Sequence, residues 1–110
     1  MGGKSFLGEF EQMVLLAVLQ LKEEAHAPDV AAELERSAQR TVSRGALYSA
    51  LDRLEKKGMV RWSIEAADSE RGGYPKRRFE VTDAGMEMLK DSRAALLNLW
   101  AGLEKDLARD

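Results

Sequence analysis

The sequence of 110 residues contains no cysteine, one histidine and two prolines. Without Cys the chain has no disulfide scaffold, no thiolate metal site and no cysteine nucleophile. A single His excludes a zinc site built on a His pair and disfavours a His-based catalytic triad. The sequence also contains no nucleophile–base pairing, metal-ligand spacing or phosphate-loop motif. We therefore expect a protein that is not an enzyme and that needs no cofactor and no metal.

Long apolar runs are also missing, because no segment approaches the roughly 18 unbroken apolar residues of a membrane helix. Residues 1–5 lead into an acidic segment instead of the apolar core of a secretory signal. With 45% hydrophobic and 33% charged residues, the chain can bury the core of one small domain. These features predict a cytoplasmic binding protein with no membrane partner.

Charge is segregated along the chain. Residues 36–78 contain 11 Lys and Arg against 5 Asp and Glu, a net charge of +6, whereas the rest of the chain has a net charge of −8. A basic middle is the electrostatic footprint expected for a polyanion such as nucleic acid. The alternative is a solvated surface with local drift in charge. The net charge of −2 for the whole chain argues against indiscriminate coating of nucleic acid.

Hydrophobic periodicity predicts three helices in the first half of the chain. Apolar residues recur every three or four positions over residues 8–23, which is the spacing of a buried helical face. Pro28 marks the start of a short second helix, since proline suits the first helical position. A third helix is predicted over roughly residues 43–57, with leucines at every third or fourth position.

After the third helix the hydrophobic period changes to two. Residues 60–65 are predicted as a strand with Trp62 on its buried face, and residues 76–81 as the returning strand. A long last helix is predicted over roughly residues 83–107. A mainly α fold with one small β-hairpin in this order is a winged helix-turn-helix. We divide it into a DNA-binding domain, residues 1–82, and a C-terminal dimerisation helix, residues 83–110.

Three blocks of the sequence resemble the PadR family of bacterial transcriptional regulators. The three blocks are residues 7–17, residues 42–60 and residues 73–85. Positions 12 and 13 of the first block do not match. The middle block is the most specific. The resemblance implies a dimeric, sequence-specific DNA-binding regulator whose third helix is the recognition element. The sequence looks like the short-tailed members of the family. The resemblance also implies a repressor whose action a small, aromatic effector relieves.

The third helix supplies the first set of candidate DNA-binding residues. Arg44 lies near its N-terminus, where a bidentate pair with a guanine edge is expected. Ser43 and Tyr48 are expected to hold phosphates, which fix register without reading sequence, and Ser49 shares their face. The alternatives are a plain helix cap for Ser43, a half-buried core aromatic for Tyr48 and a solvated charge for Arg44.

The hairpin supplies the second set. Arg71, Lys76 and Arg77 place cations on the wing, and an Arg at its tip suits the narrow minor groove of A·T-rich DNA. Gly73 permits close approach of the backbone to DNA. Arg40, in the turn before the third helix, is expected to add a backbone contact. The alternative is an ordinary polar hairpin loop. In the family the wing carries one more Arg, at the position of Tyr74.

The last helix carries an apolar seam with the spacing of a coiled coil, which predicts a homodimer. In the family this helix packs against the first helix of the other subunit. The alternative is a helix folded onto its own domain. The residues expected in the dimer interface are Val14, Val18, Leu89, Leu96, Trp100, Leu103 and Leu107.

Trp100 and Leu96 are also candidates for an effector pocket, because a flat indole ring near a dimer axis can stack on an aromatic ligand. The simpler interpretation makes Trp100 a packing residue of the dimer core. His26 is expected on the surface. The expected partners are therefore double-stranded DNA with a pseudo-palindromic operator, a second copy of the chain and a small-molecule effector. The competing hypothesis is a winged-helix protein-interaction module without a DNA site.

Overall fold

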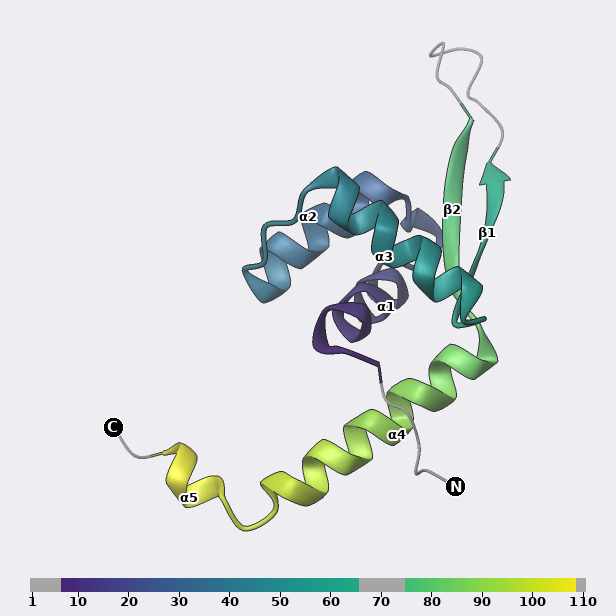
Figure 1. The fold of residues 1–110 in the computed structure, drawn as a ribbon. Helices are drawn as coiled ribbons and strands as arrows, with labels where there is room; N and C mark the ends of the chain where they lie inside the picture. The colour runs from purple at the N-terminus through teal and green to yellow at the C-terminus, as the bar shows by residue number, and fades with distance from the viewer. Residues whose placement is uncertain (1–6, 66–74, 109–110) are drawn as a thin grey trace.

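The computed structural model describes residues 7–65 and 75–108 (Figure 1). The two strands pair antiparallel, with Val60 opposite Val81 and Glu65 opposite Lys76. The predicted fold class, mainly helical with one β-hairpin, is confirmed. The elements in chain order are α1 (Glu9–Leu21), the short 3-10 helix η1 (Lys22–Glu24), α2 (Ala27–Ala38), α3 (Arg44–Lys56), β1 (Val60–Glu65), β2 (Lys76–Val81), α4 (Asp83–Trp100) and α5 (Glu104–Leu107).

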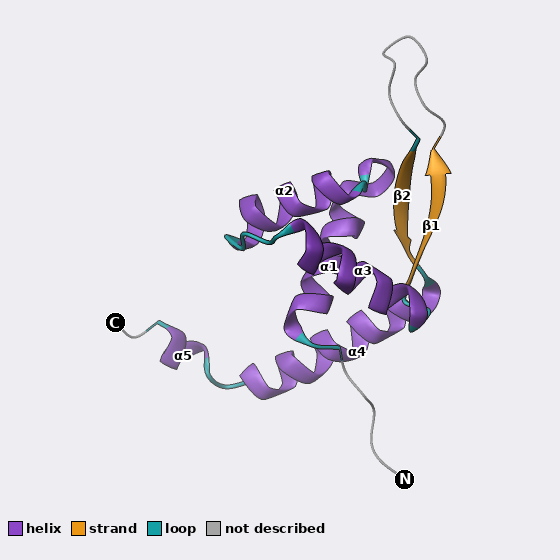
Figure 2. Ribbon diagram, turned by 45° about the horizontal axis from the view of Figure 1, so that its top comes forward, coloured by secondary structure: helices purple, strands orange, loops and turns teal. Residues whose placement is uncertain are grey.

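The core lies where α1, α2 and α3 meet the base of the hairpin. Figure 2 shows these three helices gathered on one side of the β-hairpin, while α4 runs from the base of the hairpin past α1. In α2 and α3 the buried faces are the apolar faces that periodicity predicts. The largest fully buried side chains are Val14, Leu15, Val30, Leu51, Leu54, Val60 and Phe79.

The junction between β2 and α4 is closely packed. The Thr82 hydroxyl accepts a hydrogen bond from Gly85 N at 3.1 Å and donates one to Gly58 O at 2.6 Å. A Cβ atom on Gly85 would lie 2.3 Å from Met59 O and 2.8 Å from a Val81 methyl carbon. Only glycine therefore allows this first turn of α4 to approach the turn before β1, and the junction sets the direction in which α4 leaves the domain.

The prediction of one continuous last helix to residue 107 is wrong, because α4 ends at Trp100. Ala101 is extended (φ −54°, ψ 129°) and Gly102 has a φ of +84°. Glycine adopts this left-handed conformation without steric cost, and inside a helix it costs about 1 kcal/mol relative to alanine. Leu103 and Leu107 consequently leave the apolar stripe of α4, and Leu107 lies in the separate, short α5.

Two further expectations about burial are wrong. Trp62 was predicted in the buried face of β1, yet 37% of its surface is exposed, because the hairpin projects beyond the helices after Val60. His26 was predicted on the surface, yet only 7% of it is exposed. Its ring is enclosed because the link between η1 and α2 runs beside β2, where His26 forms a bridge with Arg78.

Candidate DNA-binding surface

The N-terminal end of α3 is open to solvent. The Ser43 hydroxyl accepts a hydrogen bond from Ala46 N at 3.1 Å, so this residue is the N-cap of α3. A serine hydroxyl that accepts in this way still has its own proton to donate. Arg44 and Ser49 are exposed on the same helix, and Arg44 forms no ion pair with any residue that the structure describes. Capping by Ser43 and contact with a phosphate are thus compatible.

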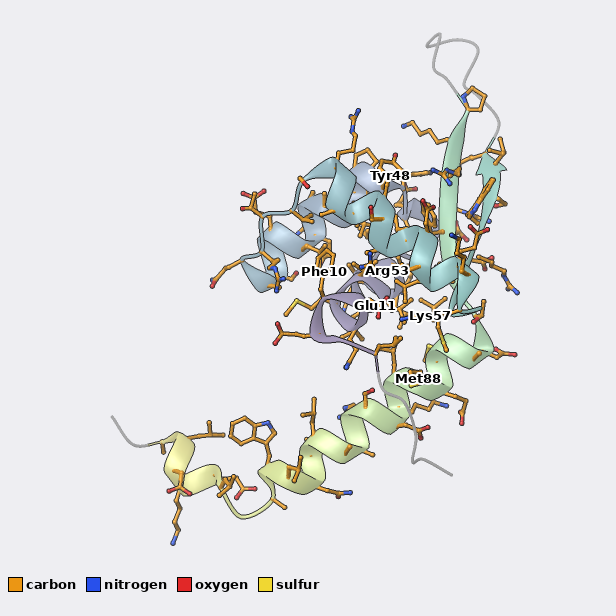
Figure 3. All side chains as sticks on the ribbon, in the orientation of Figure 1. Phe10, Glu11, Tyr48, Arg53, Lys57 and Met88 are labelled. Carbon is orange, nitrogen blue, oxygen red and sulfur yellow. The ribbon has the colours of Figure 1, made fainter. Side chains whose placement is uncertain are left out.

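Arg77 connects the hairpin to α3 through aromatic rings. Its guanidinium carbon lies 4.9 Å from the ring centre of Trp62, 5.5 Å from that of Tyr48 and 5.7 Å from that of Phe79. Cation–π contacts at such distances are attractive. Tyr48 is half-buried on the side of α3 that faces the hairpin (Figure 3). Arg77 and Tyr48 therefore hold the hairpin against α3.

A concave strip runs from the N-terminal half of α3 over the start of α2 to the hairpin. Its two adjoining hollows have volumes of about 300 and 310 Å³ and share Ala27, Pro28 and Tyr48 as lining residues. Arg44 lines the first hollow and Lys76 the second, so a cation lies at each side of the strip. This arrangement fits the backbone of a polyanion, because the two cations line neighbouring hollows of one strip.

The remaining predicted DNA contacts are placed differently. Arg40 lies near α1, with its guanidinium 3.5 Å from the Glu9 carboxylate and 5.1 Å above the ring of Phe10. It is exposed, but these contacts tie it to α1 and not to the strip between α3 and the hairpin. Arg71 and Gly73 lie outside the described residues.

Glu11 holds α1 against the C-terminal end of α3. Only 8% of Glu11 is exposed, and its carboxylate lies 3.0 Å from Lys57 Nζ and 3.4 Å from Arg53 Nε (Figure 3). Burial by itself would raise the pKa of this carboxyl group. The hydrogen bonds and charges of Lys57 and Arg53 outweigh that effect and hold the pKa below its usual value of 4.5.

Glu11→Gln is expected to lower the free energy of unfolding at pH 7 by about 1–3 kcal/mol, because charge-assisted hydrogen bonds are lost. A lowered pKa stabilises the folded state above the pKa of the unfolded chain, and this stabilisation disappears as pH falls through the folded pKa. Urea titrations should therefore show the two proteins converging below pH 4.5. Glu35→Gln, at an exposed position of α2, is the control and should change stability by less than about 0.5 kcal/mol. A constant difference across pH would contradict the ionic origin.

A second depression lies between α1 and α4, with a volume of about 440 Å³. Leu16 is 48% exposed, Leu96 51% and Trp100 47%, so its walls are apolar and open. We call it the α1–α4 groove. Its lining residues are Gln12, Leu16, Leu19, Met86, Leu89, Lys90, Arg93, Leu96, Leu97 and Trp100.

Val14 and Val18, expected to contact a second subunit, are instead core residues of this chain. They are 0% and 2% exposed, because they point toward α2, α3 and the hairpin. The large hydrophobic side chain of α1 that remains exposed is Leu16. Leu89 is also buried, at 8%, where α4 meets the core. Sequence periodicity did not single out Leu16, since apolar residues surround α1 on nearly all sides.

Within residues 7–65 and 75–108, no group of His, Cys, Asp and Glu side chains is arranged to hold a metal ion. No helix in that part of the chain is long and apolar enough to cross a membrane.

The three helices and the hairpin define a winged helix-turn-helix protein. Residues 15–91 match the model of the transcriptional regulator PadR-like family, which is well over half of the chain. The protein therefore belongs to the PadR-like family of transcriptional regulators. The search of curated proteins gave no significant match.

Solved structures agree with this assignment. A PadR-like transcription factor from Bacteroides fragilis is 25% identical, with 82% of each chain covered and a TM-score of 0.67. A PadR-like transcriptional regulator from Bacillus cereus is 21% identical, with 92% of this chain and 93% of that chain covered and a TM-score of 0.71. A PadR family regulator from Eggerthella lenta is 24% identical over 93% of this chain and 88% of that chain, with a TM-score of 0.66.

Proposed function

We propose that this regulator binds DNA as a homodimer and represses transcription until a small effector binds. In this proposal α3 enters the major groove and the hairpin follows the neighbouring backbone. The observation that carries it is the strip between α3 and the hairpin, where Arg44 and Lys76 line two adjoining hollows. Arg44 reads a base edge, while Ser43, Ser49 and Lys76 contact phosphates.

Dimerisation is supported by the apolar surface that one copy leaves open. The radius of gyration is 16.4 Å, whereas a compact domain of this length has about 13 Å. Large hydrophobic side chains on α4 and α5 are exposed, and the α1–α4 groove lies beside them. A second copy covers this surface in the proposal and brings two α3 helices onto half-sites about one helical turn apart.

The α1–α4 groove is also the proposed effector site. Its volume of about 440 Å³ is within the range of small-molecule sites, and Trp100 offers an aromatic face. An aromatic ligand that stacks there relieves repression only if it binds the DNA-incompetent spacing of the two α3 helices more tightly than the competent one. DNA would then weaken ligand binding by the same factor.

The salt dependence of binding to duplex DNA tests the DNA contact. Each phosphate contact should contribute about 0.9 to the slope of log affinity against log salt concentration. Lys76→Ala is expected to reduce that slope by about 0.9 per subunit, because Lys76 is exposed at the start of β2. Lys105→Ala removes the same charge from the distant α5 and should leave the slope unchanged. A flat slope for the parent protein would favour the winged-helix protein-interaction module instead.

A further inference from the structure

The single histidine of the chain joins two elements that both border the strip between α3 and the hairpin. His26 Nδ1 lies 3.0 Å from Asp29 Oδ2 in the first turn of α2. His26 Nε2 lies 3.0 Å from Glu65 Oε1, at the last residue of β1. Glu65 is the strand partner of Lys76. One buried ring thus links α2 to the outermost described pair of the hairpin.

The backbone around this ring reinforces the link. Phe79 N donates a hydrogen bond to Ala25 O at 2.9 Å, and His26 forms an isolated antiparallel bridge with Arg78. These contacts fix the middle of β2. The His26 side chain reaches further along the hairpin, to Glu65, and so links the end of β1 to α2 in addition to the strand pairing of Glu65 with Lys76.

Hydrogen-bond chemistry defines the protonation state that makes both contacts. A neutral imidazole carries one N–H, whereas the imidazolium carries two. Both partners of His26 are carboxylate oxygens, which accept hydrogen bonds when ionised. Only the imidazolium can therefore donate to both Asp29 and Glu65. The ionisable groups that face the ring are Asp29 of α2, Glu65 of β1, Tyr48 of α3 and Lys76, Arg77 and Arg78 of β2.

We propose that His26 is a positioning residue for DNA binding: as the imidazolium it ties the hairpin to α2 and holds Lys76 beside α3. Loss of one ring proton leaves either Asp29 or Glu65 without a donor, and where Nε2 is the atom that loses it, the end of β1 loses its link to α2. The affinity for DNA should then fall as pH rises. This inference rests on the proposed contact between the hairpin and DNA.

The scarcity of titratable residues makes the test specific. The chain has one His and no Cys, and His is the side chain whose ordinary titration lies between about pH 5 and pH 8. The nitrogen chemical shifts of this one imidazole report which ring atoms carry protons. In the full-length protein at constant salt, binding to duplex DNA is expected to weaken about three- to fivefold per subunit across the pH range in which these chemical shifts show the ring losing a proton.

Glu65→Gln is the decisive variant. The glutamine amide can donate to an unprotonated Nε2 and can also accept from a protonated one, so the link no longer needs the ring proton. We expect Glu65→Gln to bind DNA at pH 8 as well as at pH 6. Glu80→Gln is the matched control, because Glu80 lies on the same hairpin, is similarly exposed and pairs with Arg61 instead of His26. It should keep the parent pH profile.

Three outcomes would overturn the proposal. One is a ring that carries a single proton in the folded protein at pH 6. Another is a Glu65→Gln profile equal to that of Glu80→Gln. The third is affinity that does not change with pH while the ring titrates. If the parent protein binds no DNA at any pH, the proposed function fails as well. The ring shifts of the parent and of Glu65→Gln, measured without DNA, still decide whether His26 donates to Glu65.

Discussion

Replacement of Leu96 and Trp100 by glutamate is expected to convert the protein to a monomer and to weaken operator binding by about 100-fold or more, because two linked half-site readers gain about 10²–10⁴ in avidity. Both side chains line the α1–α4 groove and are half exposed in one copy. A carboxylate placed there would have to be buried without a partner on dimerisation, and such burial is strongly unfavourable.

Sedimentation equilibrium measures the first effect and operator titration the second. Asn98→Glu is the control, since Asn98 is exposed on α4 and is not among the residues of the groove. It should remain a dimer. The core around Leu51 and Phe79 lies elsewhere, so circular dichroism should find the variants folded. A double variant that sediments like the parent dimer would exclude this face as the interface.

Helices α2 and α3 could be predicted because their signals are local. Ser43 caps α3 and Pro28 lies in the first turn of α2, each within a few residues of the helix it begins. The predicted third helix, residues 43–57, extends one residue beyond the observed α3 at each end, and these two residues are its caps, Ser43 and Lys57. Capping and periodicity involve residues no more than four positions apart, so both signals can be recognised in a single sequence.

Contacts between distant residues could not be predicted in the same way. His26 and Glu65 are 39 residues apart, and no local pattern indicates that the hairpin brings them together. Apolar residues surround α1, so periodicity alone could not tell that Val14 faces the core of its own chain and Leu16 faces solvent. At the C-terminus the leucine spacing continued past Gly102, although the backbone there turns away from the helix.

Arg44→Ala is expected to weaken operator binding by roughly 1–3 kcal/mol and to relax the preference at one base pair, as for the loss of a bidentate contact with guanine. Arg44 directly follows the Ser43 cap, is exposed and lines the strip between α3 and the hairpin. The measurement is competition between the operator and duplexes that each carry one substituted base pair.

Two further variants separate base reading from simple charge. Lys56→Ala removes the same charge from the exposed C-terminal end of α3 and should leave the base preference unchanged. Arg44→Lys keeps the charge but not the planar fork of two donors, so it should retain overall affinity better than specificity. An equal loss on every duplex would make Arg44 a phosphate contact. No loss on any duplex would mean that the N-terminal end of α3 does not enter the groove. If that end did enter the groove, its exposed arginine would contact the DNA.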